Sequence, residues 1–356
     1  MIESEISCKD LAERLSIDYK TILDATFDAR PNTKNTASDE IQSNSNLVVL
    51  YTSMRNAPAS KPEIVSANPD KYIPRSIFID FQHNVVDKTS SLSNTMPPAH
   101  DFEREVERLG ISNESHIVVY DDFGNFCASR VWFMFKSMGH DKIQVLRGGL
   151  AAWLHADLPT DTQLLTSACV NSGTTQTSYI ASPSTNFRFV DRDYILRQIV
   201  ESDSEDNDAQ VLLDARSQTR FDGEQNESKP NLRAGHIPNS LNLHYARLQD
   251  KNGKFKDKNA LRKEFDNVMN ECAMKERVMN ERAIKEQAMQ EQAKRNKDAN
   301  PHLIFTCGSG VTACILAQAA DALGYSPLFV YDGSWSEWGM QTHLPITTKK
   351  DTADGD

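Results

Sequence analysis

Two stretches of the chain decide the fold: His116-Ile-Val-Val-Tyr-Asp121 and His302-Leu-Ile-Phe-Thr-Cys307. Each is a short apolar run that ends at a polar residue, which is typical of a buried strand in a parallel sheet. Each is followed by a loop and an apolar helical segment, over 128–138 and 311–323, and then by a glycine that favours the end of a helix. The same strand, loop and helix therefore occur twice in the chain.

The repeat extends in both directions from these stretches. A second predicted strand follows each helix, at 143–146 and 327–331, and precedes a segment of glycine and tryptophan that ends in Leu-Pro. Strands that alternate with helices in this way predict parallel βαβ units. The matching pairs upstream are Ile22-Leu-Asp-Ala25 with Leu212-Leu-Asp-Ala215, and Tyr72-Ile-Pro-Arg-Ser76 with His236-Ile-Pro-Asn-Ser240.

The predicted fold class is α/β, with two tandem domains of one type, each a parallel β-sheet flanked by helices. We assign 1–160 to an N-terminal non-catalytic domain, 161–186 to a polar linker and 187–356 to a C-terminal catalytic domain. Imperfect ten-residue units rich in strong helix formers predict a helical insertion at about 261–297 in the second domain. Since a ten-residue period keeps no single apolar stripe on a helix, we expect an exposed helix there rather than a coiled coil.

Composition excludes several classes of function. The chain has 39 basic and 50 acidic residues, a net charge of −11, and no basic run, so we expect no nucleic-acid partner. No apolar run approaches the roughly 20 residues that span a membrane, and the first residues lack the pattern of a signal peptide. Six scattered cysteines predict neither a disulfide scaffold nor a metal site, and favour a reducing, cytoplasmic location. We expect no cofactor.

The loop from Cys307 to Ala313 carries the chemistry that we predict. Gly308 and Gly310 allow a tight turn, and the following helix start adds a positive dipole end of about half a charge. Such a ring of N–H donors favours the thiolate, which is the nucleophilic form of cysteine. A cysteine phosphatase would need an arginine six positions after the cysteine to clamp phosphate, and this chain has Ala313 there. We therefore exclude phosphatase activity.

Three motifs together resemble the rhodanese superfamily, and within it the 3-mercaptopyruvate sulfurtransferase branch. They are the loop 307–313, the Gly-His-Ile-Pro stretch at 235–238 and Tyr331-Asp-Gly-Ser-Trp-Ser-Glu-Trp338. The resemblance spans about residues 8–348. It implies a sulfurtransferase in which Cys307 takes sulfur from 3-mercaptopyruvate as a persulfide, releases pyruvate, and passes the sulfur to a thiol, a thioredoxin-like protein or cyanide.

The resemblance also implies roles for residues around the cysteine. Catalytic roles fall on Cys307 and Ser309, whose hydroxyl would bond the substrate carbonyl or relay a proton. Two cations would bind the substrate carboxylate: Arg220 and Lys229, the second standing where the family has arginine. Arg233 is either a substitute for that arginine or a residue that only braces its loop. The backbone amides of the loop would hold charge on sulfur and substrate. These loop residues are Gly308, Gly310, Val311 and Thr312.

Three further expectations and two alternatives follow. The family has a histidine in a polar relay where this chain has Tyr72, with Asp70 nearby as a partner, and Asp121 in place of the cysteine implies no sulfur chemistry in the first domain. Thiosulfate sulfurtransferases have basic residues after the cysteine, so neutral Gly308 and Ser309 favour the 2-oxo acid donor. The alternatives are a thiosulfate sulfurtransferase, and a non-enzymatic sulfur carrier or interaction module.

Overall fold

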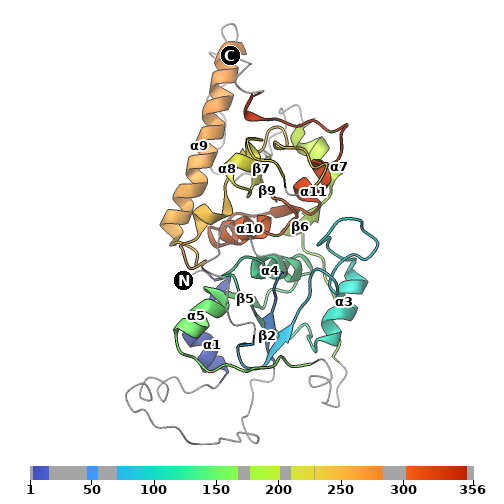
Figure 1. Cartoon of the computed structure of the whole chain (residues 1–356), viewed down its shortest axis with the longest axis vertical. Coiled ribbons are helices and arrows are strands. Elements are labelled where there is room, and N and C mark those ends of the chain that lie inside the picture. The colour runs from blue at the N-terminus through green and yellow to red at the C-terminus, as the bar shows by residue number, and fades with distance from the viewer. Residues whose placement is uncertain are drawn as a thin grey trace, which may run out of the picture. The chain divides into compact units, whose positions relative to one another are not determined.

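The computed structural model describes residues 3–15, 46–54, 70–166, 177–200, 210–227, 229–283 and 302–350, with the backbone alone over 271–283. The chain divides into two compact units (Figure 1). The first unit is Met1–Ser184 with Asp250–Lys254, and the second unit is Thr185–Gln249 with Phe255–Asp356. Among the described residues, no helix combines the length and the apolar character that crossing a membrane requires.

The first unit is built on a five-stranded sheet of order β1-β5-β4-β2-β3, in which all pairs are parallel. Its strands are β1 (Glu5–Ile6), β2 (Leu47–Tyr51), β3 (Ser76–Phe78), β4 (His116–Tyr120) and β5 (Ile143–Leu146). Its helices are α1 (Cys8–Arg14), α3 (Ala99–Arg108), α4 (Ala128–Ser137) and α5 (Gly149–His155). Buried side chains of α1 and α5 share one core cluster with β2 and β4, and α4 packs on β4 and β5.

The second unit has a five-stranded parallel sheet of order β6-β10-β9-β7-β8. Its strands are β6 (Phe187–Val190), β7 (Gln210–Asp214), β8 (Leu241–Asn242), β9 (His302–Thr306) and β10 (Leu328–Tyr331). Its helical elements are α7 (Arg192–Ile195), a π-helical turn (Leu196–Val200), α8 (Gln218–Phe221), a 3-10 helix (Tyr245–Leu248), α9 (Lys258–Ala283), α10 (Ala313–Ala322) and α11 (Ser334–Trp338). Side chains of α7 and α11 form a core cluster with β6, β7, β9 and β10, and α10 packs on β9 and β10.

The two sheets have the same strand order when each strand is counted from the start of its unit, so the predicted fold of two equivalent parallel α/β domains is confirmed. Matching hydrogen bonds repeat as well. The indole N–H of Trp153 donates to Pro159 O, and that of Trp338 donates to Pro345 O, each at 2.8 Å. The hydroxyls of Ser76 and Ser240 each donate to the carbonyl three residues earlier at 2.6 Å.

One match of the sequence repeat does not correspond to a pair of described strands. Ile22–Ala25, which we matched to Leu212–Ala215, lies outside the described residues. By sheet order the counterpart of β7 is β2, formed by Leu47–Tyr51. The reason is that any apolar run can fill a central parallel strand, so identity of four letters does not identify the strand.

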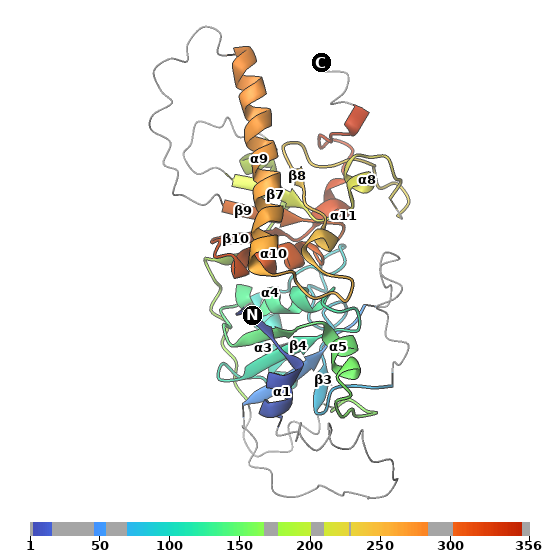
Figure 2. The ribbon, with the colours of Figure 1, turned by 90° about the vertical axis from the view of Figure 1, so that its left-hand side faces the viewer.

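The predicted insertion begins as the long helix α9, three residues earlier than expected, at Lys258 (Figure 2). The Asp257 carboxylate accepts the N–H of Ala260 at 3.0 Å, which is a helix N-cap contact. Leu261, Phe265 and Val268 are buried at helical spacing and anchor this end of the helix. Residues 284–297 of the predicted insertion lie outside the described part of the chain.

Candidate active site

Cys307 directly follows β9 at the carboxyl end of the second sheet. β7 and β9 are neighbours, and their last residues Asp214 and Thr306 are paired in register. The next residue after β7, Ala215, donates its backbone N–H to Thr306 O at 2.8 Å, so the two segments stay paired up to Cys307. The loop therefore opens where ligands gather in parallel α/β sheets, between two strand ends and the start of α10. Gly310 has φ of 73°, which lets the loop turn into the helix.

The first unit shows what this type of loop does with its backbone amides. Asp121 follows β4 as Cys307 follows β9, and its buried carboxylate lies inside the loop that leads to α4. It accepts five backbone N–H groups at 2.7–2.9 Å, from Phe123, Asn125, Phe126, Cys127 and Ala128. The loop thus converges its donors on an anionic side chain at its first position. In the first unit the Asp121 carboxylate occupies that place, and the absence of sulfur chemistry in this unit stays a prediction.

Residues of helix α11 form hydrogen bonds with the backbone at the start of the cysteine loop. The N–H of Trp335 donates to Cys307 O at 3.0 Å, and the N–H of Ser336 donates to Gly308 O at 2.8 Å. The Ser336 hydroxyl adds a second bond to Gly308 O at 2.6 Å. The Ser334 hydroxyl accepts the N–H of Cys307 at 3.3 Å, and Ser334 itself has a φ of 48°. Four hydrogen bonds therefore position the two residues at the head of the loop.

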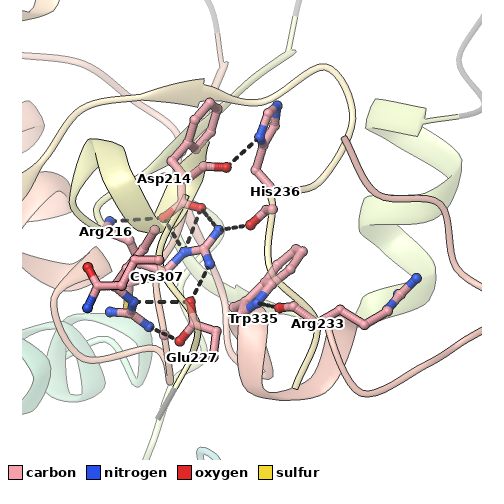
Figure 3. A network of polar contacts seen from close by, with 12 residues as sticks. Asp214, Arg216, Glu227, Arg233, His236, Cys307 and Trp335 are labelled. Atoms are coloured by element: carbon pink, nitrogen blue, oxygen red, sulfur yellow. Dashed lines mark hydrogen bonds and ion pairs between the residues drawn. The ribbon is translucent and has the colours of Figure 1, made fainter. Parts of the chain in front are cut away.

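A buried ion network lies beside Cys307 (Figure 3). Arg216 bonds both carboxylate oxygens of Asp214, at 2.6–3.1 Å, and its Nη1 donates to Glu227 Oε1 at 3.0 Å. Its guanidinium also donates to Gly235 O at 2.9 Å and stacks over the Trp335 ring at 4.4 Å. Burial alone would lower the pKa of Arg216, but the carboxylates of Asp214 and Glu227 outweigh it and raise the pKa. Arg216 is thus a fixed buried cation that ties β7 to α11.

Arg220 lies next to the cysteine loop. From α8 it binds Glu227 side-on, Nε to Oε1 at 3.1 Å and Nη2 to Oε2 at 2.6 Å. A Cβ atom placed on Gly308 would lie 3.2 Å from Arg220 Nη2 and 3.8 Å from Nη1. The guanidinium thus lies directly beside Gly308, and the role of Arg220 in binding a substrate carboxylate stays a prediction.

The other predicted cations differ from Arg220. Arg233 does not substitute for a substrate-binding arginine. Its guanidinium donates to four backbone carbonyls, of Trp338, Gly339, Gln341 and Leu344, at 2.6–3.2 Å. It braces the segment after α11. Lys229 has an exposed side chain at the start of a turn, and its role in binding the substrate stays a prediction.

The relay predicted from the sequence involves Tyr72 and Asp70 of the first unit. Tyr72 is half-buried, packs edge-on against the Tyr51 ring at a centroid distance of 5.3 Å, and pairs its backbone with Asp161. Asp70 is exposed. Since both residues belong to the first unit and Ser309 to the second, their action on Ser309 stays a prediction.

His236 has a structural role in the second unit. Its Nδ1 lies 2.8 Å from Phe221 O, and its ring stacks on Phe221 with centroids 3.7 Å apart. Burial lowers the pKa of His236 despite the bond to the carbonyl, so the neutral ring is favoured. The histidine fixes α8, which carries Arg220.

The sequence assigned no role to three residues of the site, Glu227, Ser334 and Ser336, although both serines lie in the motif 331–338. Glu227 lies in a loop, where no periodicity reports burial, yet its side chain is only 2% exposed. Ser334 and Ser336 act on residues 27 and 28 positions earlier in the chain. The motif 331–338 singled out both serines, but a sequence motif does not identify the distant residues to which their side chains bond.

Comparison with known proteins bears directly on this site. The family model of the rhodanese-like domain matches residues 66–156 and 197–341, and the second match contains Cys307, Arg220 and Glu227. The chain belongs to the rhodanese-like family. Since both units contain a match, the predicted resemblance is confirmed for the two halves of the chain.

Curated relatives are sulfurtransferases. The chain is 31% identical to thiosulfate/3-mercaptopyruvate sulfurtransferase 1, mitochondrial, of Arabidopsis thaliana, over 77% of this chain and 67% of that protein. It is 30% identical to 3-mercaptopyruvate sulfurtransferase of Escherichia coli, over 78% of this chain and 84% of that protein. The crystal structure of the Tum1 protein from Saccharomyces cerevisiae shares the fold, with a TM-score of 0.69, 22% identity and coverage of 98% and 99%. The predicted class of enzyme, a sulfurtransferase, is confirmed.

Proposed function

We propose that this chain transfers sulfur from 3-mercaptopyruvate through a persulfide on Cys307 to a thiol acceptor, with release of pyruvate. One observation carries the choice of donor. The cation beside the cysteine loop is Arg220, and it fills the room in front of Gly308. Positions 308 and 309 are themselves neutral, so the site presents a guanidinium edge suited to one carboxylate.

The reaction divides into two transfers of sulfur. The Cys307 thiolate attacks the donor's sulfur, an S–S bond forms, and the C–S bond breaks with its electron pair leaving on carbon as the enolate of pyruvate. The enolate takes up a proton and becomes pyruvate, while the persulfide gives up its proton to solvent. A thiolate acceptor then attacks the outer sulfur, and the Cys307 thiolate is restored.

The residues of the loop would supply positioning and charge. The amides of residues 308–312 would hold the charge on the persulfide, as the equivalent loop of the first unit does for the Asp121 carboxylate. Arg220 would bind the substrate carboxylate, with Lys229 as a second, more exposed cation. The Ser309 hydroxyl would meet the 2-oxo group or pass on a proton.

Thiosulfate is the second candidate donor, and it is favoured by the name of the Arabidopsis relative, which includes both donors. A thiol or thioredoxin-like protein as acceptor, and the cytoplasm as location, remain part of the proposal. The chain acting only as a sulfur carrier, without turnover of its own, is the non-enzymatic alternative.

The test is turnover with each donor. We expect pyruvate to form from 3-mercaptopyruvate with dithiothreitol or cyanide as acceptor, and intact-protein mass spectrometry to find one added sulfur on Cys307. Cys307→Ser should lose at least about a thousandfold in kcat, because the nucleophile is gone. Cys314→Ser is the matched control, since Cys314 is a buried thiol in the first turn of α10.

Two results would contradict the proposal. One is full pyruvate formation by Cys307→Ser. The other is a kcat/KM for thiosulfate above that for 3-mercaptopyruvate, which would make the chain a thiosulfate sulfurtransferase. Persulfide loading with no turnover of either donor would instead support the carrier alternative.

A further inference from the structure

We infer that Glu227 determines donor specificity: it balances the charge of Arg220 beside the cysteine loop, so that the site accepts a monoanionic donor and disfavours a dianionic one. The inference rests on the proposed function for its choice of substrates. Its physical content, the charge that an anion meets at Cys307, does not depend on that function.

Glu227 binds both arginines of the site with its two carboxylate oxygens. Oε1 accepts Arg216 Nη1 at 3.0 Å and Arg220 Nε at 3.1 Å, and Oε2 accepts Arg220 Nη2 at 2.6 Å. The Glu227 side chain is 2% exposed, and the side chains of Arg216 and Arg220 are 1% and 31% exposed. The carboxylate is therefore buried between one inner and one outer guanidinium.

The charges of this network cancel. Arg216 and Arg220 are two cations, and Asp214 and Glu227 are the two carboxylates that bind them. Because Asp214 is bonded by Arg216 alone in this set, Glu227 is the carboxylate that faces Arg220. Neutralising Glu227 would leave a net charge of about +1 next to the loop, where the interior screens charge weakly.

Glu227 also sets the direction of the Arg220 fork. The edge made by Nε and Nη2 is turned to Glu227, while Nη2 and Nη1 lie closest to Gly308. A guanidinium offers two bidentate edges to carboxylates, so one edge remains directed along the loop for a single substrate carboxylate. A dianion such as thiosulfate would meet one edge of an arginine whose positive charge Glu227 already balances.

The decisive variant is Glu227→Gln, which keeps the shape of the side chain and removes its charge. We expect the ratio of kcat/KM for thiosulfate to that for 3-mercaptopyruvate to rise about tenfold or more, since one added charge favours the dianion. Glu224→Gln is the matched control. Glu224 lies three residues earlier, is exposed and pairs with Lys349 at 2.9 Å, so the same change of charge there should leave the ratio unchanged.

A second readout needs no sulfur transfer. Alkylation of Cys307 by anionic iodoacetate and by neutral iodoacetamide, quantified at that residue by peptide mass spectrometry, reports the charge that an anion meets there. We expect Glu227→Gln to raise the iodoacetate-to-iodoacetamide rate ratio about threefold to tenfold. If no variant transfers sulfur, the proposed function fails, and this ratio still decides the role of Glu227.

Loss of a buried partner can prevent folding, so a paired variant is included. Arg220→Gln with Glu227→Gln removes one charge of each sign and leaves Arg216 bound to Asp214. Its alkylation ratio should return to the wild-type value. The inference is overturned if Glu227→Gln changes neither ratio, or if the paired variant keeps a raised alkylation ratio.

Discussion

Ser334→Ala tests whether α11 positions the nucleophile. Ser334 is fully buried, and its hydroxyl donates to Tyr331 O at 2.8 Å and accepts the Cys307 N–H at 3.3 Å. Alanine removes both bonds and leaves a buried N–H on the nucleophile itself without this acceptor. Such a group costs about 1–3 kcal/mol, and about 1.4 kcal/mol corresponds to a tenfold change in rate. We expect a loss of about 1–3 kcal/mol in unfolding free energy and about tenfold in reactivity of Cys307.

Two matched variants separate the causes. Ser334→Gly loses the same hydrogen bonds but relieves the left-handed φ of 48°, so it should be more stable than Ser334→Ala by about 1 kcal/mol. Ser336→Ala loses one bond to Gly308 O, but the Ser336 N–H still donates to that carbonyl at 2.8 Å. We expect it to cost less than about 1 kcal/mol.

The assays are urea unfolding, the rate of Cys307 alkylation by iodoacetamide, and kcat/KM. Wild-type alkylation and turnover in Ser334→Ala would refute the reasoning, as would equal stability of the alanine and glycine variants. The alkylation rate is the primary readout because it does not depend on which donor the protein uses.

Two further predictions concern the first unit. Asp121→Asn keeps one acceptor oxygen and turns an NH₂ group against N–H donors, so it should destabilise the first unit by about 3–5 kcal/mol. The rate of Cys307 alkylation should stay unchanged. A wild-type midpoint of urea unfolding would contradict the arrangement of five hydrogen bonds on Asp121. Glu5→Gln should change the pH dependence of stability, because burial, only partly offset by the charge of Arg147, raises the pKa of Glu5 from 4.5 to about 7. A raised carboxyl pKa means that stability is lost as pH rises from about 4.5 to about 7, so the glutamine variant should gain up to about 3 kcal/mol at pH 8 and nothing at pH 4. Equal gains of the variant at both pH values, measured by urea unfolding, would show that the charge of Glu5 is not the cause.

The alternation of apolar strands and helices was enough to predict two parallel α/β units, because βαβ connections are local and their patterns survive in the sequence. The strand ends at Tyr120 and Thr306 placed Asp121 and Cys307 at equivalent positions, and both sheets agree with that placement. The short identity of Ile22–Ala25 with Leu212–Ala215 did not point to β2, the strand that has in the first sheet the place of β7 in the second, since any apolar run can fill a central parallel strand.

The superfamily and the glycine loop could be identified from the sequence by itself, and so could the proposal that Cys307 is the nucleophile, because a strand, a tight turn and a helix start lie within a dozen consecutive residues. Only the tertiary structure decided what supports that loop. Three contacts join separate loops and helices: the ion pair of Glu227 with Arg220, the hydrogen bond of Ser334 with the Cys307 N–H, and the bonds of Arg233 to the carbonyls after α11. No periodicity encodes such contacts, because they arise when parallel strand ends bring distant turns to one edge of a sheet.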